Sequence, residues 1–234
     1  MSKVAIAATA AALLLGTAPM AFADGEIQNW SGTYVGAHGM WGQMGTDMAG
    51  TTNIGPWPDI FPGQRLDYDM DGFGFGAQLG VNWQAGHWVY GLELSGAVTE
   101  ISGGKKSTLG ELDDQYDSTL RNLAMLNARV GYAWRRFLPY VKFGVAGGNE
   151  RIEVLDTLIP TGAARDQIWR SGYTFGGGLE YAWRGNWSLA LEYDYTRFGN
   201  QPLNLSDTTA TYKLDDAAQN LNAVSVKINY RFGS

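Results

Sequence analysis

Hydrophobic and polar residues alternate with a period of two along most of the chain. In the stretch 73–96, FGFGAQLGVNWQAGHWVYGLELSG, one parity first carries Phe, Ala, Leu, Val and Trp, and the other carries Gly, Gln and Asn. After QAGH the alternation resumes, with Trp88, Tyr90, Leu92 and Leu94 on one parity. A period of two is typical of a strand with one apolar face, and two strands joined by about four residues that include Gly indicate a hairpin. The stretch therefore predicts a β-hairpin.

The same alternation recurs in six further segments, so the chain predicts eight strands. They lie at about 30–42, in the two arms of 73–96, and at about 120–134, 138–148, 170–183, 187–197 and 221–232. The connections QAGH, RRF and RGN are short, whereas the other four span about twenty residues or more. Short turns on one side and long loops on the other are typical of an outer-membrane barrel. We therefore predict an all-β fold: an eight-stranded antiparallel up-and-down transmembrane β-barrel with short periplasmic turns and long extracellular loops.

Aromatic residues indicate which face of the strands points outward. Six of the nine tryptophans lie at the short-turn ends of strands, and Trp41 and Trp169 lie near the opposite ends. Two aromatic belts around an apolar band are typical of a protein that crosses both interfaces of a membrane. The apolar parity should therefore face lipid, and the other parity should line the lumen. The expected membrane-interface aromatics are Trp30, Trp83, Trp88, Trp134, Trp183, Trp187, Tyr230 and Phe232.

Charged residues on the lumen parity predict ion pairs inside the barrel. Four of them lie five residues from the aromatic at the short-turn end of their strand, which suggests a single layer. The expected pairs on neighbouring strands are Glu93 with Arg129, Glu192 with Lys227, and Lys142 with Glu180. An eight-stranded barrel is just wide enough inside for side chains, so we expect these pairs to fill it. The alternative is a charged ring that selects ions.

The N-terminal stretch MSKVAIAATAAALLLGTAPMAFADG has the features of a secretory signal peptide. A lysine precedes the mostly apolar segment 4–15, and AFA at 21–23 matches a small-x-small cleavage site. The apolar segment is too short to span a membrane as a helix. We therefore expect a cleaved signal peptide at 1–23 and an outer-membrane β-barrel domain at 24–234.

Composition restricts the chemistry that the chain can perform. There is no cysteine, which excludes thiolate-ligated metal sites, and the formal net charge of −6 argues against a nucleic-acid partner. The two histidines are His38, on the lumen parity with no serine beside it, and His87, in a predicted periplasmic turn. Neither builds a nucleophile–base pair. We expect no catalytic residues, no cofactor, no metal site and no enzyme activity.

Several stretches resemble a known family. WSGTYVGAHGMWG, GAQLGVNWQAGHWVYGLELSG, ARVGYAWRRFLPYVKFGVAGG, GYTFGGGLEYAWRGNWSLALEYDYTRFG and VSVKINYRF resemble the small outer-membrane β-barrel surface antigens of alphaproteobacteria, which are similar to the transmembrane domain of outer-membrane protein A. The resemblance implies a barrel at the cell surface with a role in envelope integrity. It also implies porin-like activity or haemin binding, each of which is claimed for some members.

The last strand resembles the assembly signal of such barrels. Ser225 is followed by Tyr230 and Phe232 in alternation, which implies the barrel-assembly machinery as a partner. The strand departs from the family pattern at Lys227, where Gly is usual, and in the extension Gly233-Ser234.

These features together predict a non-enzymatic integral outer-membrane protein of a Gram-negative bacterium that contributes to envelope integrity and surface interactions. The expected partners are outer-membrane lipid and lipopolysaccharide, the assembly machinery and an extracellular ligand bound by the loops. Two alternatives remain open. One is a small-solute, porin-like channel. The other is a surface receptor for haem or another ligand, with PWPDIFPG at 56–63 as its best contact.

Overall fold

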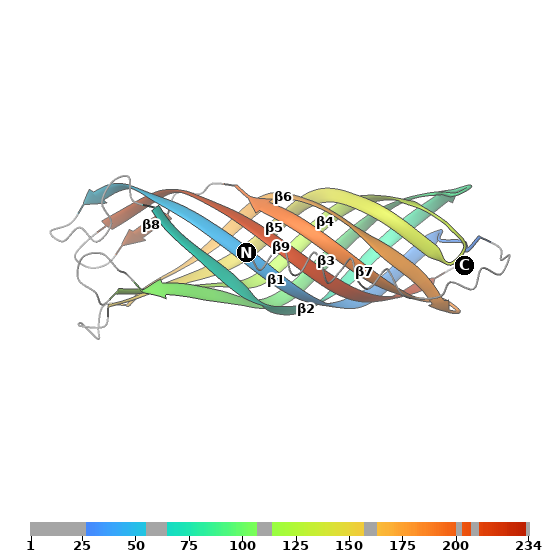
Figure 1. The fold of residues 1–234 in the computed structure, drawn as a ribbon, viewed down its shortest axis with the longest axis horizontal. Helices are drawn as coiled ribbons and strands as arrows, with labels where there is room; N and C mark the ends of the chain where they lie inside the picture. Colours follow the sequence, from blue (N-terminus) through green and yellow to red (C-terminus); the bar gives the residue numbers. More distant parts are fainter. Residues whose placement is uncertain are drawn as a thin grey trace, which may run out of the picture.

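The computed structural model of the chain is a closed antiparallel barrel whose strands are tilted to its long axis (Figure 1). It describes residues 27–54, 65–106, 114–156, 163–199, 203–206 and 211–232. The predicted signal peptide at 1–23, the stretch 56–63 and the extension 233–234 lie outside the described residues. Within the described ranges, no helix is long and apolar enough to cross a membrane.

Eight long strands form the barrel wall in the described part of the chain. They are β1 (Gly32–Ile54), β2 (Arg65–Ala85), β3 (Trp88–Lys106), β4 (Asp114–Tyr132), β5 (Phe137–Asp156), β6 (Ala163–Arg184), β7 (Trp187–Phe198) and β9 (Thr211–Phe232). Each pairs antiparallel with its neighbours, and the pairing of β1 with β9 closes the barrel. The short β8 (Leu203–Ser206) pairs with the first residues of β9. The predicted eight-stranded antiparallel barrel is therefore confirmed.

Except for β7, the wall strands extend well beyond the hydrophobic alternation, at the end away from the short turns. The pattern ends near residue 42 in the first strand, but β1 continues to Ile54, and β5 continues from about 148 to Asp156. Much of the sequence expected as long loops therefore continues the barrel wall. A strand outside lipid needs no apolar outer face, so backbone pairing persists where the pattern stops.

The opposite end of the barrel has tight turns. Gly86 and Gly185 adopt φ angles of 62° and 54°, a left-handed conformation that glycine adopts without a steric penalty. They join β2 to β3 and β6 to β7. Between β4 and β5, Arg135 adopts a φ of 56°, and Trp134 bridges to Phe137. This end is the periplasmic one in outer-membrane barrels.

Side chains alternate between the outside and the lumen along each strand. In β7, exposed Trp187 is followed by buried Ser188, and this alternation continues to Phe198. The bulky apolar parity lies outside, as predicted: Phe75, for example, is 74% exposed. In a membrane this face contacts lipid, which leaves the other parity for the lumen.

Two apolar clusters inside the lumen lie on either side of a polar layer. The cluster at the turn end consists of Trp30, Val89, Ala133, Leu138, Tyr140 and Ala182. The larger cluster lies toward the end of the barrel away from the tight turns, called the long-strand end below. It consists of Met40, Met44, Met70, Ile101, Leu120, Leu123, Met125, Ala146, Phe198, Leu221 and Ala223. The sequence pattern predicts a polar lumen and does not distinguish these clusters. The lumen is thus packed like a protein core above and below its charged middle.

Candidate functional site

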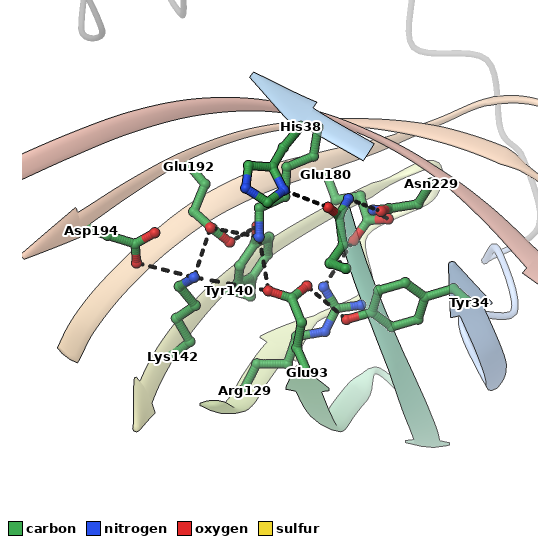
Figure 2. A network of polar contacts seen from close by, with 12 residues as sticks. Tyr34, His38, Glu93, Arg129, Tyr140, Lys142, Glu180, Glu192, Asp194 and Asn229 are labelled. Atoms are coloured by element: carbon green, nitrogen blue, oxygen red, sulfur yellow. Dashed lines mark hydrogen bonds and ion pairs between the residues drawn. The ribbon is translucent and has the colours of Figure 1, made fainter. Parts of the chain in front are cut away.

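A layer of buried charges crosses the middle of the lumen. The charged layer is defined here as Glu93, Arg129, Lys142, Glu180, Glu192, Asp194 and Lys227, and Figure 2 labels all of these except Lys227. These residues come from β3, β4, β5, β6, β7 and β9, and each is between 1% and 4% exposed. Charges so far from water are tolerated only when they are paired and hydrogen-bonded. Their contacts therefore determine what the lumen can do.

Lys227 joins two carboxylates from different sides of the barrel. Its Nζ lies 2.6 Å from Oε1 of Glu192 and 2.8 Å from Oε1 of Glu93. Glu192 is on β7, next to β9, whereas Glu93 is on β3, which does not pair with β9. The second contact therefore crosses the lumen instead of following the wall.

Lys142 makes a second cationic centre beside the first. Its Nζ lies 2.7 Å from Oε1 of Glu192, 3.1 Å from Oδ1 of Asp194 and 3.9 Å from Oε1 of Glu93. The hydroxyl of Tyr140 donates to Oε2 of Glu192 at 2.6 Å. Two ammonium groups and three carboxylates thus form one compact cluster.

Arg129 and Glu180 form the part of the charged layer nearer the turns. Nη1 of Arg129 donates to Oε2 of Glu180 at 3.1 Å, and its Nε donates to Oδ1 of Asn82 at 3.0 Å. Oε1 of Glu180 also accepts from Ser188 at 2.5 Å and from Asn229 at 3.0 Å. Both oxygens of this carboxylate are therefore satisfied inside the barrel.

Neutral side chains connect the two charged clusters. The hydroxyl of Tyr34 donates to Oε2 of Glu93 at 2.9 Å, and the Arg129 guanidinium lies 4.7 Å from the centre of the Tyr34 ring. Gln78 donates to Oδ1 of Asn229 at 2.7 Å, and its own carbonyl lies 2.7 Å from Nδ1 of His38. The result is one continuous polar network across the barrel (Figure 2).

The structure corrects two of the three predicted pairs. The predicted contact between Glu192 and Lys227 is present, but Arg129 contacts Glu180, not Glu93. Counting residues from each terminal tryptophan misplaces Arg129, because Trp88 pairs with Tyr132 and not with Trp134. Arg129 is consequently opposite Gly91, two residues out of register with Glu93.

The predicted pair of Lys142 with Glu180 is wrong for a similar reason. Glu180 is opposite Leu138 in the pairing of β5 with β6, whereas Lys142 is opposite Gly176. The positions of Lys142 and Glu180 in the register of β5 and β6 therefore differ by four residues. Lys142 instead reaches Glu192, on a strand that does not pair with β5.

A separate buried ion pair lies near the long-strand end of the lumen. Nε of Arg170 donates to Oε2 of Glu150 at 2.7 Å, and Gln219 donates to both oxygens of the same carboxylate at 3.0 and 3.1 Å. Sequence reasoning missed this group because Glu150 lies beyond the expected end of the fifth strand and Gln219 before the expected start of the eighth, although Arg170 lies at the expected start of the sixth on the lumen parity. Tyr34, Tyr140 and Asp194 were recoverable, since they share the lumen parity of the predicted charges.

Trp30 is not a membrane-interface residue, which corrects its prediction. It is 0% exposed, the Arg231 guanidinium lies 4.5 Å from the centre of its ring, and its backbone N–H donates to Gln84. Nη1 of Arg231 also donates to the carbonyl of Asn29 at 2.7 Å. Trp30 precedes β1 on the lumen parity, so its ring turns inward and fills the turn end of the barrel.

The other predicted interface aromatics lie on the outside at the turn end. Trp83, Trp88, Trp134, Trp183, Trp187 and Phe232 are between 44% and 54% exposed. Tyr230 is half-buried and makes edge contacts with Trp187 and Phe232, with ring centres 5.1 and 5.0 Å apart. Ser225, the first residue of the predicted assembly signal, is buried in the lumen. Its role in assembly stays a prediction.

The arrangement favours a static network over a reactive or open site. The charged layer and the apolar cluster beyond it leave a cavity of about 20 Å³ beside His38, Lys142 and Asp194, which is room for about one water molecule. Among the described residues, no three His, Asp or Glu side chains are placed to hold a metal ion. What the geometry provides is a connection of six strands through the lumen.

The chain is similar to known outer-membrane proteins over most of its length. The family model described as outer membrane protein beta-barrel domain matches residues 8–232. The 25 kDa outer-membrane immunogenic protein of Brucella abortus biovar 1 (strain 9-941) is 31% identical over 205 residues, which cover 87% of this chain and 80% of that protein. The 31 kDa outer-membrane immunogenic protein of Brucella melitensis biotype 1 is 30% identical over 171 residues, which cover 71% and 69%.

A solved structure has a similar fold. The outer membrane protease OmpT from Escherichia coli matches with a TM-score of 0.50 and 10% identity, covering 86% of this chain and 97% of that one. At this identity the likeness concerns the fold alone. The predicted similarity to outer-membrane surface antigens and the predicted outer-membrane location are confirmed by the family model and the Brucella relatives. The chain belongs to the outer membrane protein β-barrel family.

Proposed function

We propose that this protein is a closed structural barrel that contributes to the integrity of the outer membrane and does not conduct solutes. The observation that carries the proposal is the charged layer, in which Lys227 and Lys142 connect carboxylates on several strands at 2.6–3.1 Å. A water-filled pore would leave such groups hydrated and separate. Here each is almost fully excluded from solvent.

The packing on either side of the charged layer supports the same function. Toward the turns, Trp30, Leu138 and Val89 are at most 1% exposed. Toward the other end, Met44, Met70 and Leu221 are each 0% exposed in the larger apolar cluster. A solute would have to displace two hydrophobic cores and an ion-pair network to cross the barrel.

We further propose that the protein is not an enzyme. The Brucella relatives are named as outer-membrane immunogenic proteins. OmpT is a protease by name, but its likeness to this chain extends to the fold only. In the described part of the chain His38 contacts Gln78, an amide that cannot act as an acid or base.

Solute flux into proteoliposomes tests the proposal. The refolded protein is incorporated into liposomes, and the rate of swelling is measured in isotonic arabinose, with a general porin as the positive control. We expect swelling at the rate of protein-free liposomes. Swelling that rises with the amount of folded protein would show an open lumen and would favour the porin-like alternative.

A further inference from the structure

The lipid-facing surface of the barrel is hollowed near the long-strand ends of β3 to β7. This outer groove has a volume of about 590 Å³. It is lined by side chains that include Leu94, Ala124, Leu126, Trp169, Tyr173 and Arg197. Most of the outer face carries large apolar side chains instead, such as Phe75 and Phe143 at 74% and 61% exposure. The groove is therefore a local depression in an otherwise bulky surface.

The strand register explains the floor of the outer groove. Gly96 is opposite Ala124, Ala124 is opposite Gly147, and Gly147 is opposite Ser171. Four small residues on neighbouring strands thus form one continuous row. Such a row leaves a trough wherever the flanking rows are larger.

The flanking rows form the walls. On the turn side, Leu94, Leu126, Val145, Tyr173 and Arg197 follow one another in register across β3 to β7. On the other side the Trp169 indole lies against Gly147, so closely that a Cβ on that glycine would be 2.6 Å from the ring. The turn-side wall is aliphatic and aromatic, with a single cation at one end, whereas the other wall is the Trp169 indole, whose row also carries Asn122 and Asn149.

The outer groove lies in the half of the barrel that faces the outer leaflet. Trp169 and Tyr173 are 58% and 56% exposed at the end of the apolar band away from the tight turns. Exposed Trp and Tyr mark the membrane interface, and tight turns mark the periplasmic side. An acyl chain in this groove would therefore belong to an outer-leaflet lipid whose head group lies near Arg197.

Arg197 gives the outer groove a positive charge that is complementary to an anionic ligand. It is exposed on the lipid-facing parity, and its neighbours across the sheet, Tyr173 and Asn220, carry no charge. Among the groove-lining residues of the described chain it is the one ionised side chain. Near the membrane interface an exposed arginine costs little by itself, and its planar guanidinium matches the geometry of a lipid phosphate.

We propose that the outer groove binds a phosphorylated, acylated glycolipid of the outer leaflet. An acyl chain lies on the small-residue floor between the two walls, and a phosphate on the sugar contacts Arg197. A second copy of the chain fits less well, because a two-fold interface places each patch against itself and would bring two Arg197 side chains together.

Native mass spectrometry of the refolded full chain in detergent tests the proposal. The protein is titrated separately with bisphosphorylated lipid A, dephosphorylated lipid A and phosphatidylglycerol, and the bound fraction is measured. We expect a single tightly held lipid A. Arg197→Ala should weaken its binding about ten-fold, equivalent to about 1.4 kcal/mol. Ala124→Phe should block the groove without touching the lumen.

Matched variants separate site binding from general adhesion of lipid. Arg184→Ala removes an exposed arginine at the turn end, and Ala37→Phe enlarges an exposed small residue on β1, away from the groove. Neither should change lipid A binding. Heat-modifiable migration checks that each variant is folded.

Three results would overturn the proposal. The first is equal retention of lipid A by wild type, Arg197→Ala and Ala124→Phe. The second is equal binding of phosphorylated and dephosphorylated lipid A. The third is phosphatidylglycerol binding as tight as that of lipid A with the same dependence on Arg197, which would assign the groove to a phospholipid.

Discussion

Nζ of Lys227 lies 2.6 Å from Oε1 of Glu192, although the two residues are not opposite each other in the sheet. Glu192 is opposite Ser225, and Lys227 is opposite Ala190. The long lysine side chain spans the offset, and the same ammonium reaches Glu93 on the far side of the lumen at 2.8 Å. The charged layer is therefore organised by distances across the narrow lumen more than by the pairing of neighbouring strands.

Arg129 and Glu180 should show a large coupling energy. Removing one partner with Arg129→Gln or Glu180→Gln leaves a buried, unpaired charge, so each change should destabilise the barrel by about 3–5 kcal/mol. The double variant should lose less than the sum, because no lone charge remains. A double-mutant cycle read by urea unfolding of the refolded barrel measures this.

A double-mutant cycle for Glu93 and Arg129 is the control for the cycle of Arg129 with Glu180. These residues carry opposite charges but are not in direct contact, since Arg129 contacts Glu180 and Glu93 contacts Lys227. Their coupling should be clearly smaller than that of Arg129 with Glu180. Equal coupling in the two cycles, or none in either, would mean that these charges are hydrated or differently paired.

Trp30 and Trp83 should behave differently despite their similar positions near the turn end. Trp30 is 0% exposed inside the barrel, whereas Trp83 is 54% exposed on the outside. Trp30→Ala should therefore destabilise the barrel by about 3–5 kcal/mol, as for other buried aromatics. The contribution of each tryptophan to the fluorescence is the difference between wild type and its Phe variant. Brominated lipid should quench most of the contribution of Trp83, measured with Trp83→Phe, and little of the contribution of Trp30, measured with Trp30→Phe. Strong quenching of Trp30 would show that its side chain lies at the membrane interface and not inside the barrel.

Most of the wall could be predicted from the sequence, because alternation along a strand reports directly which face meets lipid. Trp187, Leu189 and Leu191 alternate with Ser188 and Ala190, and this fixes the orientation of β7 without further information. Trp30 was the exception, because it precedes the first strand and interrupts the outward parity of the other terminal tryptophans.

The partners inside the lumen could not be predicted in the same way. They depend on the stagger between strands: Trp88 pairs with Tyr132, the last residue of β4, whereas Trp134 lies beyond the end of that strand. In the ion pair of Glu150 with Arg170, Glu150 lies beyond the expected end of the fifth strand, so the alternation does not mark it as a lumen residue. Parity identifies which residues point inward, and the register decides which of them meet.

Substitution of Gly80 should destabilise the barrel much more than substitution of Gly39. A Cβ on Gly80 would collide with the Tyr34 ring, whose hydroxyl donates to Glu93. Gly80→Ala should therefore displace that ring and cost about 1–3 kcal/mol through overpacking. A Cβ on Gly39 would lie 3.6 Å from the Phe75 ring, an ordinary contact. Urea unfolding of the two variants measures the difference, and equal stability would contradict the packing of Tyr34 described here.

Leu79 should be sensitive to charge because it faces lipid. It is 56% exposed on the outer surface of β2, and Leu79→Arg should cost about 2–4 kcal/mol near the membrane midplane. Leu79→Ala is the control, since it removes the same side chain without adding a charge and should cost much less. Similar unfolding free energies for the two variants in lipid vesicles would show that Leu79 lies outside the apolar band.

The charged layer and the two apolar clusters should together close the lumen to ions. Current through the refolded wild-type protein in a planar lipid bilayer tests it most directly, because a single open barrel gives discrete conductance steps. We expect no steps above the bare-bilayer background, with insertion verified by heat-modifiable migration of protein recovered from the same preparation. Regular steps whose number rises with the amount of inserted barrel would contradict it and show that ions pass the layer of Lys142, Glu192 and Lys227.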